Sequence, residues 1–142
     1  MLKGIDPIVS PDLLFILAQM GHGDELVIAD ANFPAASMGK RIVRADGHSA
    51  TAVLAGVLPL FPLDSFVEAA AAVMRRVDKP DEDAPIWAQF QKLLDGAEAR
   101  HILVERLERF DFYARAQRAF AVVATGERAL YGNLILKKGV IP

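Results

Sequence analysis

The sequence PDLLFILAQMGHGDELVIAD, residues 11–30, joins a helix pattern to a strand pattern across a glycine-flanked turn. Apolar residues recur at helical spacing over residues 11–20, and a proline at the first helical position follows Ser10, a residue type that favours helix N-caps. The next apolar run, residues 26–29, predicts a short buried strand. A helix and a buried strand in close succession indicate an α/β architecture.

The same alternation continues to the end of the chain. Residues 41–44, 102–104, 121–125 and 134–136 are further strand candidates, and residues 51–58, 86–94 and 109–120 are helix candidates. Residues 66–77 suit either state, because an alanine run favours helix while valine and phenylalanine suit a strand. We therefore expect a single α/β domain over residues 1–142, in three layers, with helices flanking a mostly parallel central sheet.

Composition excludes several classes of function. The 142 residues carry a net charge of -2, which gives no basis for binding nucleic acid or an anionic membrane. No apolar run approaches the length of a membrane span, and we expect no signal peptide, because the N-terminus lacks a basic start and an apolar core. The absence of cysteine is compatible with the cytoplasmic location that we expect. At 53% hydrophobic residues, we expect other subunits to cover part of the surface.

His22 and Asp30 are the first candidates for chemistry. His22 lies in the glycine-flanked turn before the predicted strand, and Asp30 lies at the strand's carboxyl end, where open α/β sheets bind ligands. An imidazole titrates near pH ~6.5 and suits proton transfer. The two side chains are therefore expected to face one pocket. Two alternatives stay open: His22 as a helix cap or surface residue, and Asp30 as a turn former.

The segment that begins at Arg109 mixes charge with aromatic rings. An arginine can fork onto two ligand oxygens, and an aromatic face such as that of Tyr113 can stack on the apolar face of a sugar. The alternative is the start of a helix with a buried aromatic side, which we prefer for Phe110 and Phe112.

A second polar segment, Tyr131-Gly132-Asn133, stands directly before the last predicted strand. Its tyrosine and asparagine offer hydrogen-bond donors and acceptors, and its glycine permits close backbone approach. A hairpin turn is the alternative. The three histidines lack metal-ligand spacing, and there is no dinucleotide fingerprint and no nucleophile elbow. We therefore expect a proton-transfer site that needs neither metal nor cofactor.

The chain closely resembles the RbsD/FucU family of sugar mutarotases. The matching segments are 1–5 (MLKGI), 20–25 (MGHGDE), 30–34 (DANFP), 42–47 (IVRADG), 59–61 (PLF), 112–117 (FYARAQ), 125–128 (TGER), 131–133 (YGN) and 136–140 (LKKGV). The resemblance is to the fucose branch more than to the ribose pyranase branch. That second branch carries threonine and alanine where this chain has Gly23 and Gly132.

This resemblance implies interconversion of the α and β anomers of L-fucose or a related pyranose without a cofactor. It implies that His22 is the catalytic proton donor and that Asp30, Arg109, Tyr131, Gly132 and Asn133 bind the sugar, with Tyr113 as a further candidate. It also implies a ring-shaped homo-oligomer, commonly a decamer, with sites near subunit interfaces. Two other functions remain open: pyranose–furanose interconversion of ribose-like sugars, and non-catalytic sugar binding by an oligomer.

Overall fold

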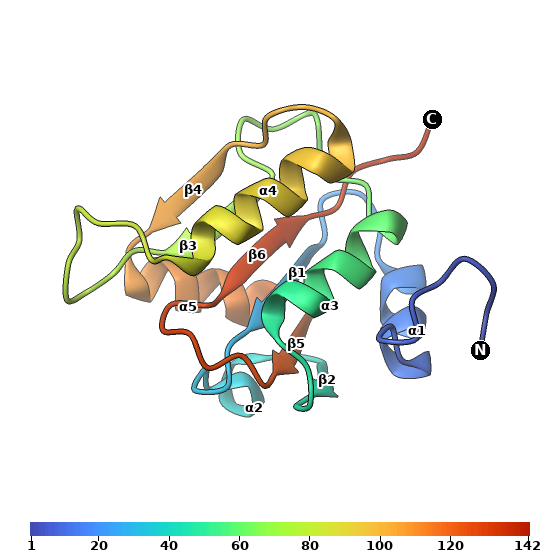
Figure 1. Ribbon diagram of the computed structural model, residues 1–142, viewed down its shortest axis with the longest axis horizontal. Helices are drawn as coiled ribbons and strands as arrows, with labels where there is room; N and C mark the ends of the chain where they lie inside the picture. Colours follow the sequence, from blue (N-terminus) through green and yellow to red (C-terminus); the bar gives the residue numbers. More distant parts are fainter.

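A six-stranded sheet forms the middle of the molecule (Figure 1). The computed structural model describes residues 1–142. The strands are β1 (Glu25–Ala29), β2 (Ile42–Ala45), β3 (Ala71–Met74), β4 (Val104–Leu107), β5 (Ala121–Thr125) and β6 (Leu134–Lys137), and their order across the sheet is β2-β5-β1-β6-β3-β4. Strand β6 runs antiparallel to both of its neighbours, and the other three pairs are parallel. The expectation of a mostly parallel sheet is confirmed.

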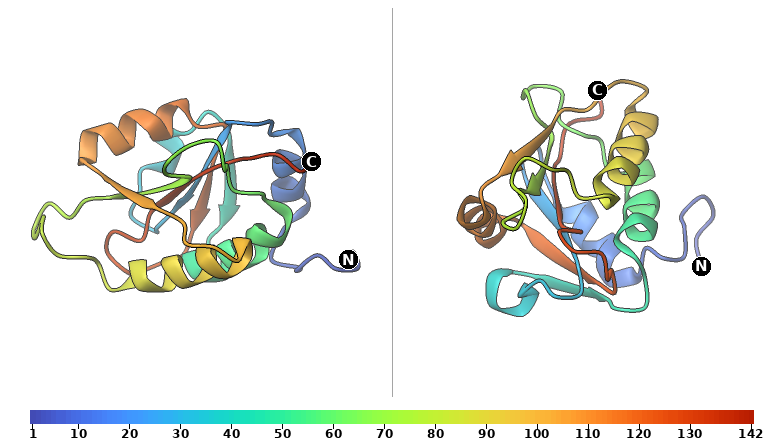
Figure 2. Two further views of the ribbon diagram at one scale, coloured as in Figure 1. Left: turned by 90° about the horizontal axis from the view of Figure 1, so that it is seen from above. Right: turned by 60° about the vertical axis from the view of Figure 1, so that its left-hand side comes forward.

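Helices cover both faces of this sheet (Figure 2). They are α1 (Pro11–Gln19), α2 (Ala35–Met38), α3 (Ala50–Val57), α4 (Ile86–Glu98) and α5 (Arg109–Arg118), and a 3₁₀ turn, η1 (Leu58–Leu60), extends α3. Helices α1, α3 and α4 pack on one face, whereas α2 and α5 pack on the other. This is the three-layer arrangement that the sequence predicts. No helix is long and apolar enough to cross a membrane.

Strand β1 shows why its apolar run is continuous. Leu26 and Ile28 point into the core beneath α1, α3 and α4, while Val27 and Ala29 point into the core beneath α5. All four side chains are fully buried, because the strand is central and both faces of the sheet are covered. Because β1 crosses the sheet from one end to the other, the turn before it and the loop after it lie at opposite ends of the strands.

Several predicted boundaries differ from the observed ones. Residues 66–77 form a loop followed by β3, because burial between two layers outweighs the helix propensity of alanine. The strand expected at 102–104 is β4, at Val104–Leu107, and Ile102 packs in the core just before it. Helix α4 continues through Gly96 and ends where Ala99 takes a left-handed conformation, with φ 52°.

Candidate functional site

A pocket of about 460 Å³ lies beyond the carboxyl end of β1. Its lining comes from five segments: the loop from β1 to α2, the end of β3, the loop after β3, the start of α5 and the residues before β6. The lining residues are Asp30, Asn32, Phe33, Pro34, Met74, Val77, Asp78, Arg109, Tyr113, Leu130, Tyr131 and Asn133. A larger groove of about 830 Å³ between α3 and α4 carries a single ionisable side chain, Lys92. The smaller pocket is the candidate site, because polar groups converge on it.

Asp30 and Asn133 form the buried polar floor of the pocket. The Asp30 backbone N–H donates to Asn133 Oδ1 at 2.7 Å, and Asn133 Nδ2 donates to Asp30 Oδ2 at 3.0 Å. The Asn32 N–H also donates to Asp30 Oδ1, at 3.0 Å, so the aspartate forms a turn as well as lining the pocket. Burial raises the pKa of Asp30 above its ordinary value, although these hydrogen bonds oppose the shift. Its carboxylate is therefore a stronger base than an exposed one.

The Tyr131-Gly132-Asn133 segment is not a hairpin turn, because β1 lies between β5 and β6 in the sheet. Tyr131 takes a left-handed conformation, with φ 59°. Its carbonyl accepts a hydrogen bond from Trp87 Nε1 at 3.0 Å, and its hydroxyl accepts one from the Val77 N–H at 3.1 Å. A Cβ on Gly132 would lie 3.0 Å from the Ala129 carbonyl oxygen. The segment is thus held tightly against the pocket.

Arg109 and Tyr113 reach the pocket from the first two turns of α5. The Arg109 guanidinium lies 4.8 Å from the centre of the Phe110 ring, and it takes part in no ion pair or side-chain hydrogen bond within the chain. Its N–H donors are therefore free for a ligand. Phe112 is buried as predicted, but the prediction for Phe110 is wrong: its ring is exposed, next to the pocket mouth.

His22 lies before the start of β1 and does not line the pocket beyond its end, so the expectation that it shares a pocket with Asp30 in one molecule is wrong. Two hydrogen bonds anchor the ends of β1 to points along β6. Next to His22, the Gly23 N–H donates to the Lys138 carbonyl, and at the other end the Asp30 N–H donates to Asn133 Oδ1. Asn133 and Lys138 flank the four residues of β6 and are five positions apart, or about 17 Å at 3.3–3.4 Å per residue. Proximity in sequence misleads here because a strand carries the chain steadily in one direction.

The imidazole of His22 is oriented by Asp64, a residue that sequence reasoning did not identify. His22 Nε2 lies 3.1 Å from Asp64 Oδ1, and the His22 side chain is 46% exposed while that of Asp64 is 3% exposed. The Phe66 N–H donates to the same oxygen at 3.0 Å, and the exposed Phe66 ring lies 5.5 Å from the imidazole. Burial raises the pKa of Asp64, but the Phe66 amide, His22 and Lys137 together bring it below its ordinary value. Asp64 is therefore ionised at neutral pH.

Replacing this carboxylate tests its role. We expect Asp64→Asn to slow the anomer exchange that the family resemblance implies by about 10-fold, with little change in the KM for the sugar. The reason is that the imidazole loses its charged partner but keeps its place in the turn. Since folding lowers the pKa of Asp64, its ionisation stabilises the fold above about pH 4 and ceases to do so as the pH falls through the folded value. The deficit of Asp64→Asn in thermal unfolding should therefore shrink from pH 7 to pH 3.

The matched control is Asp81→Asn, in an exposed loop. It should change neither turnover nor the dependence of unfolding on pH. An Asp64→Asn protein with normal turnover would show that Asp64 does not position His22.

No group of three or more histidine, aspartate or glutamate side chains lies together as a metal ion would need. The sequence-predicted residues instead form two clusters. Asp30, Arg109, Tyr113, Tyr131 and Asn133 line one pocket, and Gly132 packs beside it. His22, with Asp64 and Phe66, forms the second cluster at the opposite edge of the sheet. One cluster offers hydrogen bonds to a small polar ligand, and the other offers a proton.

Comparisons with known proteins agree in pointing to one family. A family model described as the RbsD / FucU transport protein family matches residues 3–141. The chain is 54% identical to the fucose mutarotase of Mus musculus over 99% of this chain and 95% of the relative. It is 49% identical to the L-fucose mutarotase of Histophilus somni over 100% of this chain and 99% of the relative.

Solved structures agree with these sequence matches. The fucose mutarotase of Streptococcus pneumoniae, solved in complex with L-fucose, superposes with a TM-score of 0.93 at 44% identity, covering 99% of this chain and 100% of that one. The Bacillus subtilis RbsD complexed with D-ribose superposes with a TM-score of 0.71 at 23% identity, over the whole of both chains. This more distant likeness concerns the fold alone.

Proposed function

This chain belongs to the RbsD/FucU family, and we propose that it is an isomerase that interconverts the α and β anomers of L-fucose. The observation that carries the proposal is the pocket beyond β1, which joins a buried carboxylate and amide to an unpaired guanidinium. Such groups match a pyranose, whose hydroxyls both donate and accept hydrogen bonds. Relatives named as fucose mutarotases, at about half identity over the full chain, support the choice of sugar.

In this proposal, the pocket residues bind and orient the sugar. Asp30 and Asn133 hydrogen-bond its hydroxyls from the floor, and Arg109 donates to its oxygens from the side. Tyr113 and Tyr131 offer ring faces to its apolar face, and Gly132 lets the backbone lie close beside Asp30. No metal or cofactor is part of the proposal.

His22 would act on a sugar held by a neighbouring subunit. No histidine lines the pocket, and His22 of the same chain is about 17 Å away along the sheet. Both clusters carry exposed apolar side chains suited to a subunit contact: Phe66 beside His22, and Phe110, Val77 and Leu130 around the pocket. We therefore include in the proposal a homo-oligomer whose sites lie between subunits, assembled as the ring-shaped decamer that the family resemblance implies.

The reaction then needs two proton transfers. The His22 imidazolium protonates the ring oxygen while the anomeric hydroxyl gives its proton to Asp30, whose pKa burial raises. The bond between the anomeric carbon and the ring oxygen breaks, and an aldehyde forms. Rotation about the C1–C2 bond and closure by the reverse transfers give either anomer. Because Asp64 holds Nε2 of His22, Nδ1 is the nitrogen that faces the sugar.

Saturation-transfer NMR on L-fucose tests the function directly. Irradiation of one anomeric proton should reduce the signal of the other, at a rate proportional to the concentration of the protein. A ligand-induced rise in unfolding temperature without exchange would instead identify a sugar-binding protein. Faster pyranose–furanose exchange of D-ribose than anomer exchange of L-fucose would identify a pyranase. A cytoplasmic location, with which the absence of cysteine is compatible, completes the proposal.

A further inference from the structure

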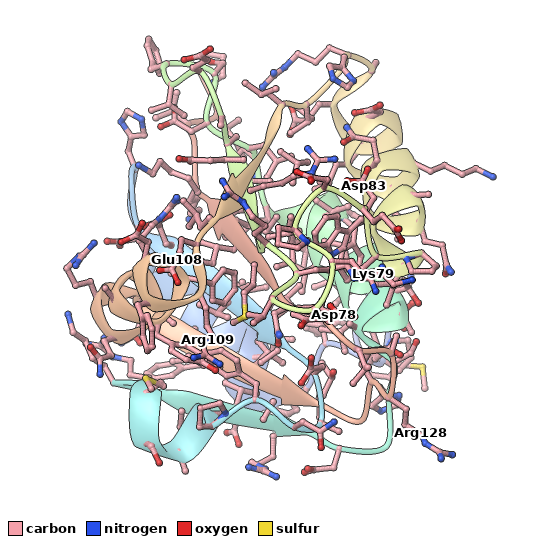
Figure 3. The ribbon with its side chains drawn as sticks, turned by 90° about the vertical axis from the view of Figure 1, so that its left-hand side faces the viewer. Asp78, Lys79, Asp83, Glu108, Arg109 and Arg128 are labelled. Atoms are coloured by element: carbon pink, nitrogen blue, oxygen red, sulfur yellow. The ribbon has the colours of Figure 1, made fainter.

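Asp78 is a second carboxylate at the candidate site, on the loop between β3 and α4. It lines the same pocket as Arg109, which reaches it from α5, and the two residues lie on one face of the molecule (Figure 3). The Asp78 side chain is 50% exposed, so it lies at the mouth of the pocket rather than on its floor. Neither the histidine chemistry nor the floor formed by Asp30 requires this carboxylate.

The Asp78 carboxylate is fixed in place by Arg76. Nε of Arg76 lies 3.2 Å from Oδ1 of Asp78, and Nη2 lies 2.8 Å from Oδ2, so the guanidinium grips both oxygens. Arg76 is itself 15% exposed and also reaches the backbone carbonyl of Asp83. The Val77 N–H ties the same loop to the hydroxyl of Tyr131. The loop therefore presents a pre-oriented acceptor to a ligand, which lowers the ordering cost of binding.

This ion pair leaves acceptor capacity unused. Each carboxylate oxygen can accept two hydrogen bonds; Arg76 occupies one on each oxygen and the Tyr131 hydroxyl occupies a third, which leaves one for a ligand. The Arg76 guanidinium, together with the hydroxyl of Tyr131, holds the pKa of Asp78 well below its ordinary range. Asp78 therefore stays ionised and accepts hydrogen bonds without taking up a proton. This distinguishes it from Asp30, whose pKa is raised.

Arg109 and Asp78 carry opposite charges at one pocket without forming an ion pair with each other, since the ion pair of Asp78 is with Arg76. A sugar hydroxyl both accepts and donates, so one hydroxyl, or two adjacent ones, can take a hydrogen bond from Arg109 and give one to Asp78. We propose that Asp78 is a specificity-determining residue that accepts a hydrogen bond from a non-anomeric hydroxyl of the pyranose. This inference rests on the proposed sugar-binding function of the pocket.

A cycle of variants and deoxy sugars tests it. The proteins are the wild type, Asp78→Ala, the shape-conserving Asp78→Asn, and the control Asp81→Asn from the same exposed loop. The ligands are L-fucose and its 2-, 3- and 4-deoxy analogues, with affinities from calorimetry and anomer exchange from NMR. Asp78→Ala should weaken L-fucose binding about 10- to 100-fold, because the lost hydrogen bond is to a charged acceptor. Exchange at low L-fucose should fall by a similar factor, because the rate there follows the affinity for the sugar.

The decisive result is the coupling between protein and ligand. One deoxy analogue should bind Asp78→Ala and the wild type equally, because the hydroxyl that Asp78 recognises is already absent. If Asp78→Ala lowered the affinity for every sugar by the same factor, the proposal would be overturned, and Asp78 would only hold the loop. If the alanine variant does not fold, Asp78→Asn serves for the same comparison. A wild type that binds L-fucose but does not exchange its anomers would contradict the proposed function and leave this coupling measurable.

Discussion

His22→Ala will slow the exchange of L-fucose anomers by about 10²–10⁴-fold, the range that a positioned acid–base group supplies. The imidazole is the proton donor of the proposed reaction, and no other histidine lines the pocket. The affinity for L-fucose should change little, because the residues that bind the sugar belong to the other cluster. Saturation-transfer NMR measures the rate, and calorimetry measures the affinity.

The control for this variant is His101→Ala. His101 is also exposed and also paired with an aspartate, Nδ1 lying 3.3 Å from Oδ2 of Asp95, but it lies outside both clusters. His101→Ala should therefore exchange anomers at the wild-type rate. A His22→Ala protein that folds and exchanges anomers normally would remove His22 from the mechanism.

Two inactive variants, assembled together, will recover activity. His22→Ala lacks the proton donor, and Arg109→Ala lacks a residue that binds the sugar, so each alone should show little exchange at low L-fucose. If a site takes His22 from one subunit and Arg109 from the next, random co-assembly of equal amounts makes about a quarter of the sites fully wild type. The exchange rate of co-expressed subunits should therefore approach about a quarter of the wild-type rate.

Combining the two purified variants without dissociating their subunits provides the control and should leave the mixture inactive. An inactive co-assembled protein would show that both residues act within one subunit. In that case, the placement of His22 at the far end of β1 would have to change on binding.

Local patterns were sufficient to predict most of the fold. The continuous apolar run of β1 and the alternation of strands and helices follow from burial and periodicity, which neighbouring residues reveal. Whether residues 66–77 form a helix or a strand could not be predicted from such local patterns. Ala71 and Ala72 belong to a strand only because β4 and β6 lie on either side of them. Pairing with distant segments, rather than intrinsic propensity, determines whether such a stretch becomes a strand.

The candidate site was predicted in part, for the same physical reason. Asp30, Arg109 and Asn133 line one pocket because the loops beyond the sheet's end converge there. Asp64 was not predicted, since it lies 42 residues from His22 and is brought to it by tertiary structure, next to the bridge between Leu63 and Lys138. Asp78 was also not predicted, because its role depends on the grip of Arg76 and on the approach of Tyr131, both set by tertiary packing.

The separation of the two clusters by the length of β1 bears on how many sites an assembly completes. Subunits that pass His22 forward into the next pocket meet through two different surfaces, a heterologous contact. An open row of such subunits always ends with one pocket that receives no histidine and one histidine that serves no pocket. A closed ring has neither end, so every subunit both gives a proton donor and receives one. In the proposed assembly, ring closure would thus add a working site in addition to the stability of one more interface.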